Sequence, residues 1–369
     1  MFGYVRSKLR GELMFKNIKI SNLRAITELE INNFGQVNLF VGQNCCGKTT
    51  ILEALFLLIG ATNPNLPLVA NSLRGLSYFA REIWQSFFHN YEDSYPITIK
   101  GGFRDYKTGY QDDKTLTIKC KKTTEEVKPL SSGEVNEPIR NGSSQSNLVT
   151  TGLDLEYVSS REPSKKIRTV ISEKDKGVAP EGTKPSYAQG FFMGPYSQGA
   201  DLKARFDSIQ NKKQLLDEVI SLLRHIDPNI SDLRLNRAGI LIADIGISSL
   251  IPVNLLGGGM MKFLDVAFAM LNFKNGIVLI DEIENGLHHS AQGKLWEAIF
   301  SWSQRQNVQV FATTHSYECI KAFEKFSKNS LFPEKAKLFR IERESDKFKS
   351  VEFSSNELER FLENIWEIR

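Results

Sequence analysis

The chain has 369 residues, which allows about two domains of ordinary size or one elaborated domain. Its 47 basic and 43 acidic residues leave a net charge of +4, so charge alone does not indicate a nucleic-acid-binding protein. No apolar run is long enough to span a membrane, and the N-terminus lacks the apolar segment and cleavage site of a secretion signal, so we expect a soluble, cytoplasmic protein with no membrane contact.

A phosphate-binding loop follows the first predicted strands. Alternating residues in 15–31 predict a β-hairpin-like entry, and residues 42–50, GQNCCGKTT, then match GxxxxGK[ST] between an apolar strand and an apolar helix. Successive backbone N–H groups of such a loop converge on phosphates at a helix N-terminus. Lys48 is expected to contact the β- and γ-phosphates, and the Thr49 hydroxyl to hold Mg²⁺.

Two of the four cysteines lie within this loop. Cys45 and Cys46 are adjacent, and neither they nor Cys120 and Cys319 show metal-type spacing, which fits a reducing compartment rather than a disulfide framework. Oxidation of Cys45 or Cys46 would block ATP binding. We favour the simpler interpretation that both residues fill space beneath the nucleotide.

The middle of the chain is predicted to form an antiparallel β subdomain. A helix with an aromatic face over 72–89 is expected to pack within this lobe. The strands of the subdomain are read from alternating patterns at 96–106, 115–120, 153–157 and 166–172.

Two polar stretches interrupt this subdomain. Residues 121–147 and 173–186 are rich in Ser, Gly, Glu and Lys and poor in aromatic residues, so we expect mobile loops there. Acidic and basic residues are nearly balanced across 121–190, which gives no electrostatic basis for binding DNA through this insertion. A solvated insertion is the favoured interpretation, and a docking element for another protein is the alternative.

A second glycine turn lies in the second half of the chain. Before this turn we expect an ordered segment at 191–197, a helix over 201–226 and short strands at 231–247. Residues 255–271, LLGGGMMKFLDVAFAML, then open with three glycines and form a second anion-binding helix N-terminus. One nucleotide rarely needs two such sites from one chain. We therefore expect a head-to-tail homodimer, or a higher homo-oligomer, in which Gly257, Gly258 and Gly259 cap the γ-phosphate held by the partner.

Two further strands are predicted to end at the nucleotide. The strand in 277–284, IVLIDEIE, finishes in paired carboxylates, which a phosphoryl-transfer site needs beside a phosphate loop. Asp281 is expected to act on the Mg²⁺ shell, and Glu282 to polarise the attacking water. The next strand, VQVFATTHS at 308–316, places His315 at its end, where it is expected to sense the γ-phosphate.

The order of these motifs resembles that of an ABC-class ATPase head, in the group that contains RecF, the SMC proteins and the OLD (overcoming lysogenization defect) ATPases. The phrase IDEIENGLHHSAQGKLWEAIF followed by VFATTHS is most similar to the OLD branch, and the resemblance covers 14–60 and 191–325. It implies an α/β fold: an ABC-type P-loop ATPase head with a mixed or parallel nucleotide-binding sheet, an antiparallel β subdomain and a helical lobe. It also implies ATP and Mg²⁺ as cofactors and ATP hydrolysis as the reaction.

The resemblance also assigns roles to individual residues. Asp281 and Glu282 would serve Mg²⁺ and water, and His315 would be the switch histidine. Phosphate contacts fall to Gly42, Asn44, Gly47, Lys48, Thr49 and Thr50. The chain would divide into four parts. Residues 1–60 hold the N-terminal strands and the phosphate loop, and 61–190 form an insertion. Residues 191–325 form a lobe with the signature loop and the catalytic carboxylates, and 326–369 form a strand–helix tail.

The chain departs from the pattern of this class at three points. Gly257 replaces the serine of the usual LSGG signature, and loss of that charge-assisted hydrogen bond costs about 1–3 kcal/mol, so ATP-driven closure is expected to be weak or slow. Gln198 is our candidate for the metal-binding glutamine of the loop that joins the lobes. His288 and His289 imitate metal ligands, but adjacent side chains on one helical turn diverge, so we interpret them as structural.

Many OLD-like chains carry a Toprim nuclease domain after the switch histidine, and we expect none here. The residues after His315 predict one or two strands and a helix, without a paired DxD motif for catalytic metals. Any nuclease or toxin is then a separate protein. The favoured function is the sensor or regulatory ATPase subunit of a two-component antiphage defence system that controls such an effector.

Two other functions remain open. The first alternative is a RecF-like repair or recombination ATPase, for which DNA is the partner and salt-sensitive, ATP-dependent DNA binding is the test. The second is the ATPase subunit of a transporter, which requires a membrane partner. The phrase DEIENGLHH disfavours the transporter.

Overall fold

The computed structural model describes most of the chain. The described residues are 4–5, 13–76, 82–105, 108–126, 146–174, 177–181, 189–195, 202–328, 335–353 and 355–363. Gln198, the predicted glutamine-loop residue, lies outside them.

A seven-stranded mixed sheet carries the loop at residues 42–50. Its strands, in spatial order, are β1 (Tyr4–Val5), β10 (Gly190–Met193), β14 (Ile277–Ile280), β15 (Gln309–Thr313), β4 (Val37–Val41), β16 (Ala336–Glu344) and β17 (Lys347–Phe353). The five inner strands are parallel, and the two edge strands pair antiparallel to their neighbours. Every residue of β4, β10, β14 and β15 is buried, which explains their nearly continuous apolar sequences.

A second, antiparallel sheet of seven strands packs beneath the first. Its order is β3 (Ile26–Ile31), β2 (Leu13–Leu23), β5 (Ile97–Asp105), β6 (Gln111–Glu126), β7 (Ser146–Ser159), β8 (Ile167–Lys174) and β9 (Gly177–Glu181). The β2–β3 hairpin confirms the predicted N-terminal entry. Because β2 pairs with β5, this sheet joins the N-terminal strands to the middle of the chain.

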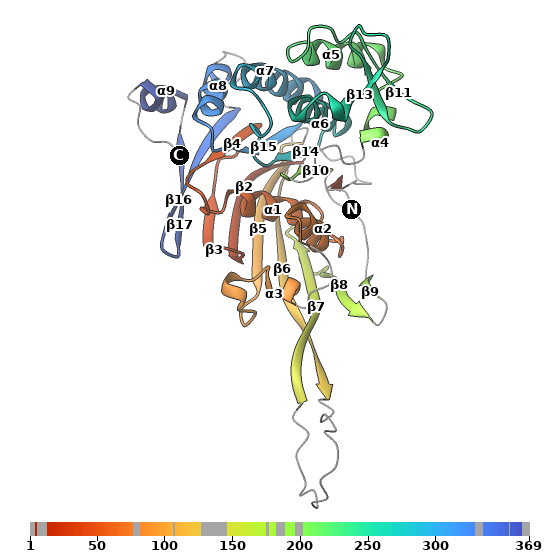
Figure 1. Cartoon of the computed structure of the whole chain (residues 1–369). Helices are drawn as coiled ribbons and strands as arrows, with labels where there is room; N and C mark the ends of the chain where they lie inside the picture. Colours follow the sequence, from red (N-terminus) through yellow and green to blue (C-terminus); the bar gives the residue numbers. More distant parts are fainter. Residues whose placement is uncertain are drawn as a thin grey trace, which may run out of the picture.

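Part of the polar sequence predicted as loops forms strands instead. In 121–147, β6 continues to Glu126 and pairs with a β7 that begins at Ser146, and in 173–186 β9 pairs with β8. The prediction was wrong there because cross-strand backbone hydrogen bonds form irrespective of polarity when the side chains face water. The two long strands make a ribbon that projects from the body of the molecule (Figure 1).

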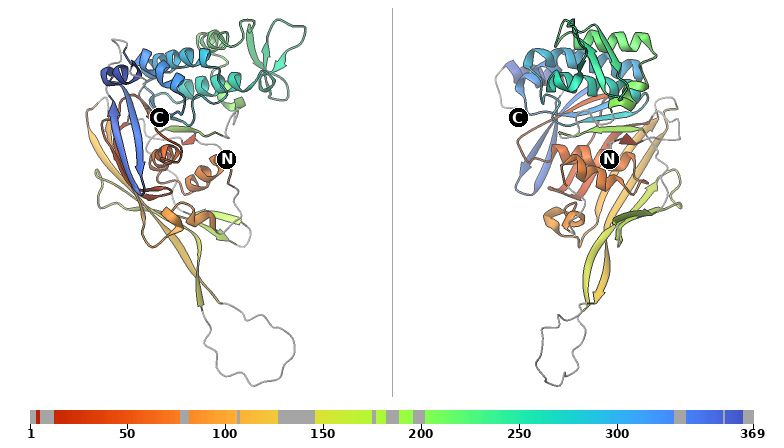
Figure 2. Two further views of the ribbon diagram at one scale, coloured as in Figure 1. Left: turned by 60° about the vertical axis from the view of Figure 1, so that its left-hand side comes forward. Right: turned by 45° about the vertical axis from the view of Figure 1, so that its right-hand side comes forward.

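Helix α1 (Lys48–Ile59) lies between the two sheets (Figure 2). All its residues except Thr49 are buried, which explains its all-round apolar sequence. Three short helices follow it: α2 (Leu66–Leu73), α3 (Glu82–Gln85) and η1 (His89–Tyr91). The single helix predicted over 72–89 is therefore wrong. Gly75, with φ of 76°, adopts the left-handed conformation that ends a helix.

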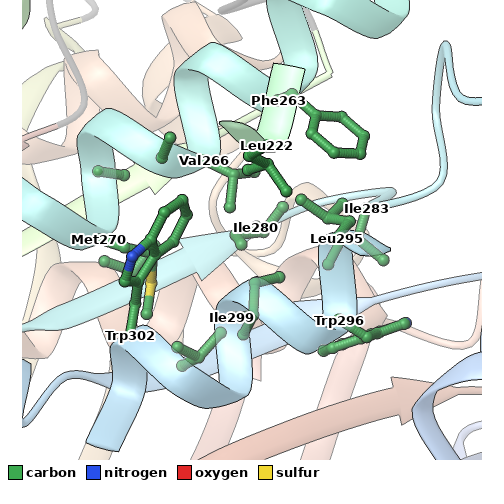
Figure 3. Packing of buried hydrophobic residues seen from close by; sticks show 14 of the residues in the cluster. Leu222, Phe263, Val266, Met270, Ile280, Ile283, Leu295, Trp296, Ile299 and Trp302 are labelled. Carbon is green, nitrogen blue, oxygen red and sulfur yellow. The ribbon is translucent and has the colours of Figure 1, made fainter. Parts of the chain in front are cut away.

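Further helices cover the face of the first seven-stranded sheet that lies away from α1 (Figure 1). They are α4 (Leu202–Asp207), α5 (Lys213–Leu223), α6 (Gly258–Asn272), α7 (His289–Gln306), α8 (Tyr317–Ser327) and α9 (Ser355–Glu363). Figure 3 shows α6 and α7 packing their apolar side chains against Ile280 of β14. A small sheet of β11 (Asp232–Leu235), β12 (Leu241–Asp244) and β13 (Ile251–Pro252), followed by η2 (Val253–Leu255), precedes α6.

One helix predicted in this layer is divided in two. The sequence pattern favoured a single helix over 201–226, but the chain turns between α4 and α5. Ile209 in this turn is fully buried, and its N–H donates to the carbonyl of Phe206, three residues earlier. Insertion of Ile209 into the core stabilises the turn at the expense of helix continuity. None of the helices in the described ranges is long and apolar enough to cross a membrane.

Candidate functional site

The loop between β4 and α1 is closed around the Lys48 ammonium group. Its Nζ donates to the carbonyls of Gly42 and Gln43, each at 2.8 Å, and only 5% of the residue is exposed. Gly47 has φ of 92°, and a Cβ on Gly42 would approach the Ile341 carbonyl oxygen to 2.4 Å, so both glycines are required by the backbone. Burial lowers the pKa of Lys48 from its usual value. Phosphate oxygens would offer this ammonium group a stronger partner than the carbonyls.

The other side chains of the loop differ in exposure. Asn44 and Cys45 are exposed, whereas Cys46 and Thr50 are buried. Cys45 has a φ of 61° and an exposed side chain, and the expectation that it lies beneath a bound nucleotide stays a prediction. Cys46 lies inside, with Sγ 3.6 Å from Lys48 Nζ.

Thr49 and Asp281 meet as the sequence predicts. The Thr49 hydroxyl donates to Asp281 Oδ2 at 2.8 Å, and the Thr313 hydroxyl donates to Oδ1 at 2.6 Å. Asp281 is 1% exposed, so its carboxylate depends on these two partners for its solvation. Adjacent hydroxyl and carboxylate oxygens are the ligands that Mg²⁺ prefers, so the residues present fit a magnesium ion.

Glu282 follows directly and has an unusual backbone. Its φ of 47° is left-handed, and its N–H donates to Thr313 Oγ1 at 2.9 Å. Asn285 donates to its carboxylate at 3.3 Å. Burial, together with the negative charges of Asp281 and Glu284, raises the pKa of Glu282 above its usual value of 4.5. A carboxylate of raised pKa is a better proton acceptor at neutral pH.

His315 lies just after the C-terminus of β15, beside the same edge of the sheet. Its backbone N–H donates to Glu284 Oε1 at 2.7 Å. Burial and the positive charge of Lys48 lower the pKa of His315 below 6.5, so its ring is neutral at physiological pH. A neutral ring carries one N–H that can donate to a phosphate oxygen.

Three residues at the site had no assigned role in the sequence prediction. Glu284 bonds the His315 backbone, and its Oε2 is buried without a hydrogen-bond partner among the described residues. Thr313 bonds both Asp281 and Glu282, and Lys262 of α6 donates to the carbonyls of the same two residues. A single lysine within the apolar run MMKFLDVAFAML was the available signal for Lys262.

A buried carboxylate supports the first turns of α1. Glu53 is 1% exposed and bonds Arg24 of the β2–β3 turn and Arg74 after α2. Burial by itself would raise the pKa of Glu53, but the two guanidinium groups lower it. Arg74 also reaches the Thr50 hydroxyl at 3.4 Å, so this cluster extends to the phosphate loop.

The glycine turn before α6 is separate from the phosphate loop. Within the described part of the chain, no hydrogen bond joins Gly257, Gly258 or Gly259 to residues 42–50. Gly257 has φ of 95° and ψ of 162°, a conformation almost restricted to glycine, which explains why serine is replaced here. A Cβ on Gly259 would lie 3.0 Å from the Gly286 carbonyl oxygen, so this turn packs closely on the segment after Glu282.

The paired histidines after this segment do not diverge as expected. The ring centroids of His288 and His289 are 4.1 Å apart, because His288 precedes the helix and takes an extended conformation. His288 accepts from the Ser290 N–H and caps α7. Among the described residues, no cluster of three or more His, Cys, Asp or Glu could hold a metal ion, and the structural role of both histidines stays a prediction.

The fold and these contacts define a P-loop ATPase of the ABC/SMC-head type. A solved structure of an SMC head bound to the C-winged helix domain of ScpA matches with a TM-score of 0.51 and 13% identity, covering 92% of this chain and 97% of that one. This similarity concerns the fold.

A family model described as "AAA domain, putative AbiEii toxin, Type IV TA system" matches residues 37–320, and the chain belongs to this family. An ATP/GTP phosphatase of Helicobacter pylori is 22% identical over 373 residues, covering 95% of this chain and 98% of the relative. An OLD nuclease of Thermus scotoductus is 24% identical over 342 residues, covering 82% of this chain and 59% of the relative. These findings confirm the resemblance to the OLD and SMC group and the prediction of an ATPase.

Proposed function

We propose that the chain binds ATP with Mg²⁺ in the loop between β4 and α1 and hydrolyses it at the composite site of a homodimer. The observation that carries the proposal is the hydrogen-bonded series Thr49–Asp281–Thr313, which joins the first turn of α1 to the carboxyl ends of the adjacent parallel strands β14 and β15. Lys48 would hold the β- and γ-phosphates, and Thr49 with Asp281 would hold Mg²⁺. Bound Mg²⁺ supplies neutralisation of the charge that develops on the phosphates.

Glu282 would act on the attacking water, and His315 would contact the γ-phosphate. Glu282 would orient the attacking water and accept its proton, a role supported by its raised pKa. Neutral His315 would donate its ring N–H to the γ-phosphate. This contact would make the position of β15 sensitive to the presence of the γ-phosphate.

A second copy of the chain would complete the site. Gly257 and Gly258 are exposed at the start of α6, a fifteen-residue helix whose first N–H groups and dipole favour an anion. The neighbouring Leu255 is 72% exposed, which a partner subunit would cover. The expected arrangement is head-to-tail, with each glycine turn on the other protomer's γ-phosphate.

We further propose that this ATPase regulates a separate nuclease or toxin in antiphage defence. The support is that the family description names a putative toxin and that one relative is named a nuclease. The chain spans about three fifths of that nuclease, so the activity of the whole relative is not transferred to this chain.

The test is a plaque assay with the gene in its native operon. Lys48→Ala is expected to abolish protection, whereas Lys213→Ala, which removes an exposed lysine of α5, should retain it. Mass spectrometry of proteins that co-purify with the tagged chain should identify the effector. Equal plaque counts with and without the operon would refute the defence role, and ATP-dependent, salt-sensitive DNA binding by the chain alone would favour the RecF-like alternative.

A further inference from the structure

The backbone of Glu282 is held in a conformation that glutamate does not favour. Its φ of 47° lies in the left-handed region, where a side chain collides with its own backbone and costs free energy. Such conformations persist only when surrounding contacts enforce them. The contacts that enforce this one therefore determine where the Glu282 carboxylate lies.

Side chains from other elements bind both polar groups of the Glu282 backbone, and its carbonyl also accepts from the Asn285 N–H at 2.9 Å. The N–H donates to Thr313 Oγ1 at 2.9 Å, at the end of β15. The carbonyl accepts from Lys262 Nζ at 3.0 Å, and the preceding carbonyl, of Asp281, lies 3.3 Å from the same nitrogen. Lys262 thus bridges the two residues on which the proposed hydrolysis depends.

Lys262 is a buried ammonium group whose described hydrogen bonds all go to backbone carbonyls. It is 1% exposed on the second turn of α6, and its Nζ is committed to these carbonyls. Burial lowers its pKa, while the carboxylates of Glu284, Asp265, Asp281 and Glu282 oppose that effect. A buried charge of this kind is tolerated only where polar partners compensate for the lost hydration.

We propose that Lys262 is a positioning residue for ATP hydrolysis, which holds the Glu282 backbone so that its carboxylate faces the attacking water. The inference rests on the proposed role of Glu282. Lys262 lies about one helical turn after Gly258 and Gly259, so it also joins the glycine turn that would cap the partner's γ-phosphate to the segment that carries Glu282. Closure of the dimer and placement of the base would then be coupled through one side chain.

The test compares Lys262→Met with Lys262→Arg and with Lys274→Met, which removes an exposed lysine just beyond α6. Lys262→Met removes the donor and keeps most of the side-chain volume. We expect its kcat to fall about 10- to 100-fold, because a small misplacement of a catalytic group has effects of this size, while KM and the dissociation constant of a fluorescent ATP analogue stay within about twofold. Lys262→Arg should recover part of kcat, and Lys274→Met should behave like the wild type.

A double-mutant cycle separates positioning from general destabilisation. If Lys262 acts through Glu282, adding Lys262→Met to Glu282→Gln lowers the residual rate no further. Full activity of Lys262→Met, or independent and multiplicative losses in the double variant, would overturn the inference while leaving the proposed function intact. Should Lys262→Met fail to fold, Lys262→Gln, whose shorter side chain withdraws the donor from the Glu282 carbonyl, must show the same kcat loss at unchanged KM. A wild-type protein without ATP hydrolysis would refute the proposed function itself.

Discussion

Replacement of Glu53 by Ala should destabilise the protein strongly. The substitution removes the carboxylate that bonds Arg24 and Arg74, whose side chains are only 10% and 34% exposed. Removing one partner of a buried ion pair costs about 3–5 kcal/mol, and the partial exposure of Arg74 favours the lower limit of about 3 kcal/mol. A loss of 1 kcal/mol lowers the melting temperature by about 2–4 °C in a domain of 150–250 residues, and by somewhat less in a longer chain. The melting temperature of Glu53→Ala should therefore fall by about 5–10 °C.

Differential scanning calorimetry without nucleotide is the direct measurement. The matched control is Glu297→Ala, which breaks the exposed pair with Lys294 and should change the melting temperature by less than about 2 °C. Equal shifts for Glu53→Ala and Glu297→Ala would refute the reasoning. The pKa of Glu53 is lower in the folded than in the unfolded protein. Its ionised carboxylate therefore adds to the free energy of unfolding above the unfolded pKa of about 4.3, and this stabilisation is lost as pH falls through the folded pKa. The difference between wild type and variant should therefore shrink in acid.

Three further predictions concern the nucleotide. Lys48→Ala should weaken ATP binding at least about tenfold, since a hydrogen bond from a charged group contributes about 1.5–3 kcal/mol, and unimpaired turnover would contradict the phosphate-loop assignment. Glu282→Gln should slow hydrolysis by about 10²–10⁴-fold and let ATP-bound dimers accumulate in sedimentation velocity; a sedimentation coefficient that never responds to ATP would argue against the gated dimer. In a pH–rate profile, the raised pKa of Glu282 should make kcat decline on acidification at a pH above 4.5, and Glu282→Gln should lose this limb.

The sequence identified most of the residues that the structure brings to the site. Lys48 and Thr49 were found from the match to GxxxxGK[ST]. Asp281 and His315 were found because each follows a buried strand, and the carboxyl ends of parallel strands lie along one edge of a sheet. Their relative distances required the strand order, which places β15 between β14 and β4 although β4 comes first in the chain.

The supporting residues of the site were harder to find. Glu284 and Thr313 stand within the quoted motifs, but their hydrogen bonds depend on backbone turns that local pattern does not encode. Lys262 is on another helix, and only the packing of α6 on β14 brings it to the Glu282 carbonyl. The Arg24–Glu53–Arg74 cluster likewise joins three segments that are apart in sequence.

Local sequence determined the elements whose signal is strong over their own length. The glycine-rich loop, the buried strands and the apolar helices α1 and α6 are of this kind, because backbone geometry and apolar periodicity are local properties. The break between α4 and α5 and the extended β6–β7 ribbon were decided by tertiary structure. There, burial of Ile209 and cross-strand pairing outweighed a helix or loop preference of only a few tenths of a kcal/mol per residue.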